Sequence, residues 1–178
     1  TVEYYDGLGR KEQVVTNGVK PEDPSKSLLS RTIYDDRGNE WKKFLPVPTT
    51  GLDYQTNISY KHNDSKALSA ITYDALDRPV FATTPGSDMG GKGKKHEFLA
   101  NKANCVKKYT VSDDGSLVQK GYYLEAALSW ERITDEDNNV TDIYTNLLGQ
   151  KVLERHVMAQ GAVDTYFVYN DCYKLCYV

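Results

Sequence analysis

The hexapeptide Tyr5-Asp6-Gly7-Leu8-Gly9-Arg10 recurs along the chain and decides the fold that we expect. Its spacing returns at Tyr34-Asp35-Asp36-Arg37-Gly38-Asn39 and at Tyr73-Asp74-Ala75-Leu76-Asp77-Arg78. The Asp side chain can accept hydrogen bonds from the backbone of the turn that follows, and Gly, Asn or Asp tolerates the left-handed conformation that closes such a turn. Tyrosine before the turn suits a half-buried sheet surface. Each unit therefore predicts a β-hairpin built on a type I turn with a bulge.

Weaker copies of the unit follow at Asp113-Asp114-Gly115, at 135–139, at 146–150 and at 169–173. Apolar and β-branched residues between the copies predict the remaining strands of an all-β, mostly antiparallel, curved sheet made of successive hairpins, with few or no helices. The expected strand segments are 2–19 around the first turn, 28–33, 41–45, 70–83 around the third turn, 105–111, 116–123, 140–144, 151–157 and 163–169. The residues expected to build the turns are Tyr5, Asp6, Gly9, Arg10, Tyr34, Asp35, Gly38, Tyr73, Asp74, Arg78, Asn146 and Gly149.

Four segments are less regular. Residues 46–51 are expected to end the strand before them, and 53–69 fits either a short strand or one helical turn. Residues 85–95, with four glycines, predict an exposed flexible loop whose lysines are available to an acidic partner. Glu125-Ala126-Ala127 contains the best helix formers and fits one short helix.

Composition limits the class of protein. The 178 residues are 39% hydrophobic, which is enough for one folded domain or two small ones, and we expect a single domain over 1–178. A net charge of −3 gives no global attraction to nucleic acid or anionic lipid, and no apolar run is long enough to insert into a membrane. The first residues contain no initiator Met and no basic and apolar leader pattern, so no signal peptide is expected in this chain. The strand pattern that begins at Thr1 predicts a piece of a longer protein. The sequence leaves open one disulfide or free buried thiols at Cys105, Cys172 and Cys176.

The ordered series of Tyr-Asp units resembles the YD repeat of RHS (rearrangement hotspot) proteins, whose motif is Tyr-Asp, two variable residues, then Gly-Arg. The series that begins at Thr1 and includes Phe44-Leu45-Pro46, Gly121-Tyr122-Tyr123 and 164–169 is similar to the amino-terminal domain of RHS proteins of the Bacteroidetes type. The resemblance implies a strand over 128–134, where the local sequence also fits a helix. The chain departs from the motif at Asp77, Asn138 and Tyr173 in place of Gly, and at Gln150 in place of Arg, which leaves the geometry of those turns open.

Candidate reactive sites are few. His62, His96 and His156 lie in no recognisable nucleophile or metal motif, so no catalytic residue, metal site or cofactor is expected. Residues 135–139 resemble a calcium loop, but Val140 and Asn146 replace its glycine and its glutamate, so a turn is favoured. Tyr122, Tyr123 and Trp130 are candidates for stacking against a sugar ring, although strand alternation would turn neighbours to opposite faces.

The resemblance implies a non-catalytic module of a β-sheet shell, in a secreted or cell-surface protein that delivers a toxin or effector. Its expected partners are the remaining RHS repeats of the parent chain and a carboxy-terminal toxin. The alternative is a cell-surface binding module that recognises a glycan or a protein. Tyrosines gathered in one exposed patch would favour the binding module, and tyrosines distributed among strand pairs would favour the shell.

Overall fold

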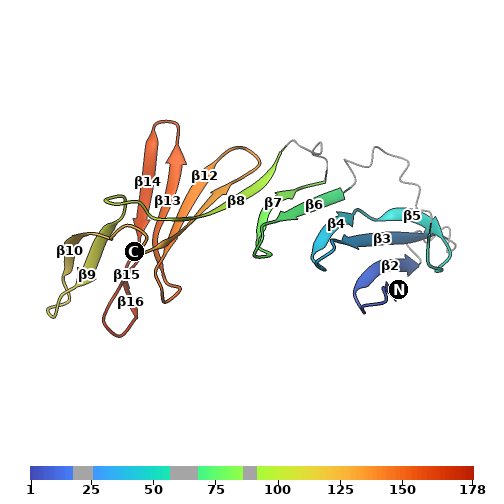
Figure 1. Cartoon of the computed structure of the whole chain (residues 1–178), viewed down its shortest axis with the longest axis horizontal. Coiled ribbons are helices and arrows are strands. Elements are labelled where there is room, and N and C mark those ends of the chain that lie inside the picture. Colours follow the sequence, from blue (N-terminus) through green and yellow to red (C-terminus); the bar gives the residue numbers. More distant parts are fainter. Residues whose placement is uncertain (18–25, 57–67, 86–91) are drawn as a thin grey trace. The chain divides into compact units, whose positions relative to one another are not determined.

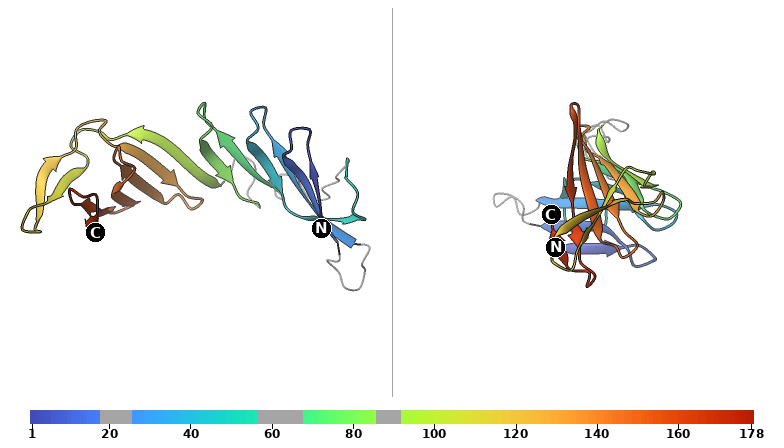
Figure 2. Two further views of the ribbon diagram at one scale, coloured as in Figure 1. Left: turned by 90° about the horizontal axis from the view of Figure 1, so that it is seen from below. Right: turned by 90° about the vertical axis from the view of Figure 1, so that its left-hand side faces the viewer.

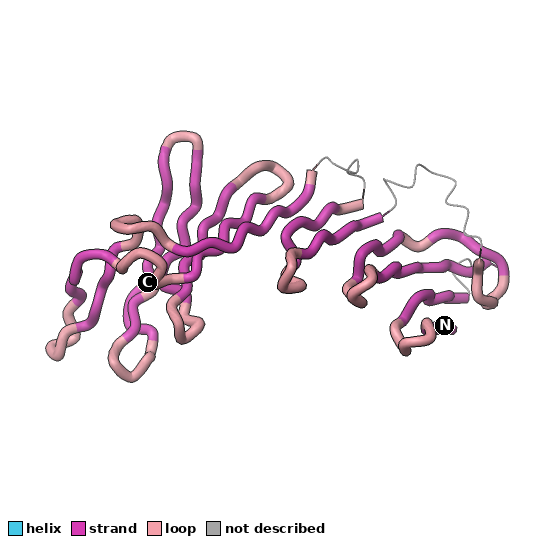
Figure 3. The backbone as a smooth tube through the Cα atoms, in the orientation of Figure 1, coloured by secondary structure: helices cyan, strands magenta, loops and turns pink. Residues whose placement is uncertain are grey.

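The computed structural model describes residues 1–17, 26–56, 68–85 and 92–178, and it confirms the all-β prediction (Figure 1). These residues form sixteen strands joined by turns and loops, and the described part of the chain contains no helix (Figure 3). Every strand pairing for which residue partners are defined is antiparallel. The strands divide into two compact units, Thr1–Gly93 and Lys94–Val178, where the sequence analysis predicted one domain.

Unit 1 is a sheet of successive hairpins with the strand order β1-β2-β3-β4-β6-β7. Its strands are β1 (Val2–Tyr5), β2 (Lys11–Asn17), β3 (Lys26–Tyr34), β4 (Glu40–Phe44), β5 (Val47–Thr50), β6 (Leu68–Tyr73) and β7 (Pro79–Thr83). Gln13, Val15 and Leu29 are buried while their neighbours along the strand are more exposed, so the period-2 pattern orients these strands. The turns after β1, β3 and β6 (dark blue, light blue and green) lie at the same end of the strands of this sheet (Figure 2).

Residues 46–51, expected to end a strand, instead contain β5. This short strand pairs with β3, and Leu28 lies opposite Pro48. Proline is compatible with a strand whose N–H side carries no partner, which is the situation of an edge strand. Asp53 to Thr56 follow it without regular structure; 57–67, including His62, lie outside the described residues.

Unit 2 contains one five-stranded sheet and two separate hairpins. The sheet has the order β8-β11-β12-β13-β14, and β9–β10 and β15–β16 form the hairpins. The strands of unit 2 are β8 (Gly93–Ala100), β9 (Lys107–Val111), β10 (Leu117–Tyr122), β11 (Ser129–Thr134), β12 (Val140–Thr145), β13 (Lys151–Met158), β14 (Gly161–Tyr166), β15 (Val168–Tyr169) and β16 (Leu175–Tyr177). The first residue of β8, Gly93, is also the last residue of unit 1. The buried core of the unit consists of Val106, Leu128, Tyr144, Val152 and Leu153.

The flexible loop predicted over 85–95 extends too far towards the carboxy terminus. Gly93 to Lys95 belong to β8, and Lys95 lies opposite Thr134 of β11. A Cβ at Gly93 would come within 2.6 Å of the Ala82 carbonyl oxygen, so glycine here permits a close backbone approach and does not mark a loop. Residues 86–91 lie outside the described part of the chain.

The helix-forming run Glu125-Ala126-Ala127 is a loop, and the strand implied at 128–134 is confirmed as β11. Ala126 has a φ of 57°. The reason is Asn101, which is buried and is distant in sequence. Its backbone oxygen accepts from the Ala126 N–H at 2.9 Å, its side-chain oxygen accepts from the Leu128 N–H at 2.7 Å, and its Nδ2 donates to the Leu124 carbonyl at 2.8 Å. These tertiary hydrogen bonds override local helix propensity.

Candidate functional site

The first Tyr-Asp unit folds as the predicted type I turn with a glycine bulge. The Gly9 N–H donates to the Asp6 carbonyl at 3.0 Å, and the Asp6 N–H donates to the Arg10 carbonyl at 2.9 Å. Gly9 has a φ of 76°, in the left-handed region. The register of β1 and β2 shifts at Tyr5, next to the turn, as a bulge requires.

The same backbone geometry occurs in seven turns among the described residues. We call the first residue of each turn its cap residue and count from it. In all seven, the fourth N–H donates to the cap carbonyl at 2.8–3.2 Å and the cap N–H donates to the fifth carbonyl at 2.9–3.0 Å. The cap residues are Asp6, Asp35, Asp74, Ser112, Asp135, Asn146 and Asn170. The fourth residues, with their φ values, are Gly9 (76°), Gly38 (92°), Asp77 (60°), Gly115 (84°), Asn138 (64°), Gly149 (77°) and Tyr173 (60°).

Asp77, Asn138 and Tyr173 therefore adopt the conformation that glycine adopts in the other turns. The departures from the motif do not change the turn. The turn of the fourth copy begins one residue before the stretch 113–115 that marks it in the sequence, because Ser112 is its cap residue. Residues 135–139 form one of these turns, as the sequence analysis favoured over a calcium loop.

The cap side chain completes the turn. One Asp6 Oδ1 accepts the Leu8 N–H at 2.8 Å and the Arg10 N–H at 2.9 Å. The equivalent pair of backbone hydrogen bonds, to the third and fifth N–H, is present at five other caps: Asp35, Asp74, Asp135, Asn146 and Asn170. The Ser112 turn is the variant, since Asp114 accepts the Ser116 N–H in its place.

In six of the seven turns the fifth side chain forms a hydrogen bond with the side chain of the cap residue. Where the cap is Asp, a donor stands at the fifth position: Arg10 Nε lies 2.7 Å from Asp6 Oδ2. Where the cap is Asn146, its Nδ2 donates to Gln150 Oε1 at 2.8 Å. An amide cap can donate as well as accept, and Gln150 supplies the acceptor. The turn capped by Asn170 keeps the same backbone geometry with Lys174 at its fifth position.

Tyrosine hydroxyls connect three of the hairpins to the one before them. Tyr34 donates to the Lys11 carbonyl at 2.9 Å, and Tyr73 donates to the Glu40 carbonyl at 2.9 Å. In unit 2, Tyr169 donates to the Lys151 carbonyl at 3.2 Å. Each tyrosine precedes a cap residue, and each acceptor lies five residues after the preceding cap. The sequence places Tyr34 and Tyr73 in the turn motif but does not reveal this contact, which depends on how separate hairpins pair.

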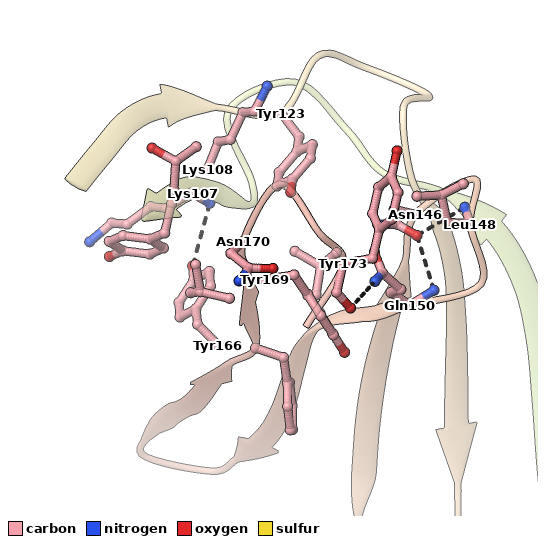
Figure 4. A pocket seen from close by; sticks show the side chains of 15 residues that line it. Lys107, Lys108, Tyr123, Asn146, Leu148, Gln150, Tyr166, Tyr169, Asn170 and Tyr173 are labelled. Carbon is pink, nitrogen blue, oxygen red and sulfur yellow. Dashed lines mark hydrogen bonds between the residues drawn. The ribbon is translucent and has the colours of Figure 1, made fainter. Parts of the chain in front are cut away.

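Neighbouring turns also contact each other directly. Arg37 Nη1 lies 3.0 Å from the Asp74 carbonyl oxygen and 2.8 Å from Asp77 Oδ1. In unit 2, Gln150 Nε2 donates to the Tyr173 carbonyl at 3.3 Å (Figure 4). The guanidinium of Arg10 lies 4.6 Å from the centre of the Tyr34 ring, within cation–π range. Arg10, Tyr34 and Asp74, which the sequence assigns to the turn motif, therefore also take part in contacts between hairpins.

The Tyr73 hydroxyl offers a direct test of these connections. We expect Tyr73→Phe to lower the free energy of unfolding by about 0.5–1.5 kcal/mol, because the hydrogen bond to the Glu40 carbonyl is lost. Urea denaturation followed by circular dichroism measures the change. Tyr5→Phe is the matched control in the same unit, since its hydroxyl bonds the partly exposed Glu3 side chain and no backbone carbonyl. Equal midpoints for wild type and Tyr73→Phe would contradict the role assigned to the hydroxyl.

The turn hydrogen bonds hold the carboxylates in their charged form. The Arg10 backbone N–H is the main cause that lowers the pKa of Asp6, and the Arg78 N–H does the same for the pKa of Asp74. Side-chain hydrogen bonds from Asn139 lower the pKa of Asp135, and those from Ser112 and Ser116, with the Ser116 N–H, lower the pKa of Asp114 to about 2. The folded state thus binds these protons more weakly than the unfolded chain does.

A carboxyl group whose pKa is lower in the folded than in the unfolded state stabilises the fold above its unfolded pKa of about 3.9. This contribution to the free energy of unfolding is lost as the pH falls through the folded pKa. We expect the urea midpoint to fall progressively from about pH 4 to about pH 2. Asp135→Asn is the control, because Asn146 shows that an amide also forms this turn; its midpoint should depend less on pH. A midpoint that is constant or rises below pH 4 would contradict this account.

The turns of unit 2 also border a small pocket (Figure 4). Tyr123, Asn146, Tyr166 and Tyr173 are among its lining residues, and the Tyr166 hydroxyl accepts the Lys107 N–H at 3.4 Å. Its volume is about 190 Å³. Pockets that enclose small molecules commonly measure about 300–1,000 Å³. Tyr166 and Tyr173, which line the pocket, form hydrogen bonds between hairpins. The pocket is therefore better explained as a gap between packed hairpins than as a substrate site.

The candidate stacking residues are separated. Tyr122 and Tyr123 line one pocket together with Leu124 and Leu147, whereas Trp130 lines another. Trp130 stacks on Tyr144 at 5.6 Å between ring centres, and its Nε1 donates to Asp142 Oδ1 at 2.9 Å. The structure thus does not assemble these three aromatic residues into one platform.

A row of alternating charges crosses the unit 2 sheet, which the sequence analysis did not identify. Register places Glu97, Arg132, Asp142, Arg155 and Asp164 opposite one another on five neighbouring strands. Arg132 contacts both carboxylate oxygens of Asp142 at 2.8 and 2.9 Å, and Arg155 contacts both of Asp164 at 2.6 and 2.7 Å. The Arg155 hydrogen bonds lower the pKa of Asp164. Cross-strand pairs of opposite charge stabilise a sheet register.

The reactive side chains lie apart. His96 contacts Glu131 at 2.6 Å, His156 lies 3.2 Å from the Thr141 hydroxyl, and no group of potential metal ligands gathers in the described ranges. Cys105, Cys172 and Cys176 are free thiols. Cys172 and Cys176 are exposed, against the expectation of burial, because they belong to the small terminal hairpin.

The fold defines an all-β protein made of hairpins on capped turns. Residues 1–100, more than half of the chain, match the model of the family DUF6443, a domain of unknown function, and the chain belongs to this family. The capped turns continue beyond the matched residues, from Ser112 to Asn170. A search of curated proteins found no match. The described residues also contain no helix suited to crossing a membrane.

Proposed function

We propose that the chain is a non-catalytic structural module of an RHS/YD-repeat protein and forms part of a β-sheet shell for a secreted or cell-surface toxin or effector. Its partners would be further repeats of the parent chain and a carboxy-terminal toxin. The observation that carries the proposal is the recurrence of one capped turn seven times, with tyrosine contacts between successive hairpins. Repeats that contact mainly their neighbours can extend a sheet without limit and accumulate curvature.

The use of side chains supports a scaffold. Asp and Asn cap backbone turns, and Tyr34, Tyr73 and Tyr169 bond backbone carbonyls. Acid–base or nucleophilic catalysis needs a reactive group that a partner positions for the substrate. His96 pairs with Glu131 and His156 with Glu154. The Cys105 and Cys176 thiols bond backbone carbonyls, so among the described residues neither thiol is paired with an imidazole.

Electron microscopy of the full-length protein that carries this chain tests the shell directly. We expect a hollow, β-walled particle in which the segment after the repeats resists added protease until the particle is denatured. An extended particle without an enclosed space, with that segment cleaved as rapidly as in the denatured protein, would overturn the proposal.

A panel of glycoside, ester and peptide substrates tests the absence of catalysis that we propose. The wild type is compared with a variant in which His62, His96 and His156 are all replaced by Ala. We expect no turnover from either protein. Turnover by the wild type that is lost in the folded triple variant would contradict a structural module.

The second candidate is a cell-surface module that binds a glycan or a protein. One observation favours it: Tyr122, Leu124, Leu147 and Leu148 are exposed around one apolar pocket of unit 2. Leu124 and Leu147 are 80% and 96% exposed, which is unusual for large apolar side chains gathered at one place. Binding in a glycan array or pull-down assay that is lost on Leu124→Ser with Leu147→Ser would support this candidate over the shell.

A further inference from the structure

Three pairs of successive capped hairpins share one register. Gln13 lies opposite Arg31, Lys42 opposite Ala70, and Leu153 opposite Tyr166. In each pair the first residue lies seven positions after its cap (Asp6, Asp35 or Asn146), and the second lies four positions before the next cap (Asp35, Asp74 or Asn170). The same offset therefore occurs in both units, although the connecting segments differ in length.

The tyrosine before the later cap closes each of these junctions. Its hydroxyl donates to the carbonyl five positions after the earlier cap, as at Tyr34, Tyr73 and Tyr169. At the first junction, the fifth residue Arg10 also covers the Tyr34 ring. Three features thus define a junction: the strand register, the tyrosine hydrogen bond and, where the fifth residue is a cation, its contact with the ring.

Tyr5 occupies the position of Tyr34 and Tyr73, but none of the described hairpins lies beside it on the outer side of β1. β1 is the outermost strand in the order of unit 1, and no described strand pairs with its outer side. Tyr5 is 55% exposed, whereas Tyr34 and Tyr73 are half-buried. Its hydroxyl donates to Glu3 Oε2 at 2.6 Å, on its own strand. An unpaired edge with an available tyrosine is a template for another strand.

We infer that the outer edge of β1 is the docking site for a further hairpin of the same capped type. The register places the residue seven positions after the cap of that hairpin opposite Val2. The Tyr5 hydroxyl exchanges Glu3 for the carbonyl five positions after that cap, and a cation at the fifth position of the turn covers the Tyr5 ring. This inference rests on the proposed function for the source of the hairpin, which is another repeat of the parent chain.

The test uses the full chain with one added hairpin. A second copy of Val2–Asn17 is joined to Thr1 through a flexible Gly/Ser linker of about ten residues, which keeps the hairpin at millimolar effective concentration. Its Arg10 and Lys11 supply the cation and the carbonyl that Tyr34 uses inside the sheet. Amide hydrogen exchange at Glu3 to Tyr5 of the original β1, resolved by NMR, reports docking.

We expect exchange at the original β1 to slow by about one order of magnitude or more with the added hairpin. It should not slow with an added hairpin of scrambled sequence, and Tyr5→Phe in the original strand should reduce the effect. No slowing, equal slowing with the scrambled hairpin, or protection at another strand in place of β1 would overturn the inference. The electron-microscopy result for the shell does not depend on this outcome, so the two failures are distinguishable.

Discussion

Replacing Asp142 by Ala should lower the free energy of unfolding by about 2–3 kcal/mol. Asp142 is 2% exposed and accepts three hydrogen bonds, two from Arg132 and one from the Trp130 indole. Its loss leaves the Arg132 guanidinium without its carboxylate beside the core residue Tyr144. The side chain of Arg132 is 36% exposed, so water compensates part of the loss, and the effect stays below the ~3–5 kcal/mol of a fully buried pair.

Urea unfolding measured by tryptophan fluorescence reports this change, because Trp130 contacts Asp142 directly. Asp142→Asn is the matched variant: it keeps an acceptor for the Trp130 indole and removes the charge, so we expect an intermediate loss. Substitutions at ordinary surface sites change the free energy of unfolding by less than about 0.5 kcal/mol. A change of that size for Asp142→Ala would show that the row of charges does not stabilise the sheet.

The second large effect is expected at a turn. Gly149→Val should cost about 1–3 kcal/mol, because a β-branched residue is strained at a φ of 77°. A Cβ at Gly149 meets no atom within 4 Å, so the cost comes from the backbone and not from a clash. Leu147→Val is the control in the same turn, since this side chain is 96% exposed and the residue does not have a positive φ.

Urea midpoints of both variants, measured under one set of conditions, decide the question. We expect Gly149→Val to unfold at a clearly lower urea concentration than Leu147→Val, which should remain close to the wild type. Equal midpoints for the two variants would mean that the left-handed conformation at Gly149 is not required for the fold.

The local part of the fold could be predicted from the sequence. Asp6 and Gly9 lie three residues apart, and the hydrogen bonds that join them depend only on that short segment, so the hexapeptide was sufficient. The same holds for Asp35 with Gly38 and for Asn146 with Gly149. The turns at Asp77, Asn138 and Tyr173 do not follow from the motif, because these residues adopt the left-handed conformation less readily than glycine. The motif does not show how strongly the other hydrogen bonds of the turn impose that conformation.

The contacts between hairpins could not be predicted from the sequence. The hydrogen bond from Tyr34 to the Lys11 carbonyl depends on the register between β2 and β3. The length of the segment that connects these two strands does not determine that register. Asn101 converts the helix-forming 125–127 into a loop through hydrogen bonds across more than twenty residues. The charged row required the pairing of five strands before Arg132 and Asp142 could be placed opposite each other.

The central claim is that one turn geometry recurs whatever residue occupies its fourth position, and Asn138 tests it most directly. Asn138 is exposed and has a φ of 64°. The urea midpoint is measured for Asn138→Gly and Asn138→Val. The account predicts that Gly leaves the midpoint unchanged or raises it, because glycine adopts positive φ freely, and that Val lowers it. A midpoint that Gly lowers and Val leaves unchanged, as at an ordinary strand position, would contradict the account.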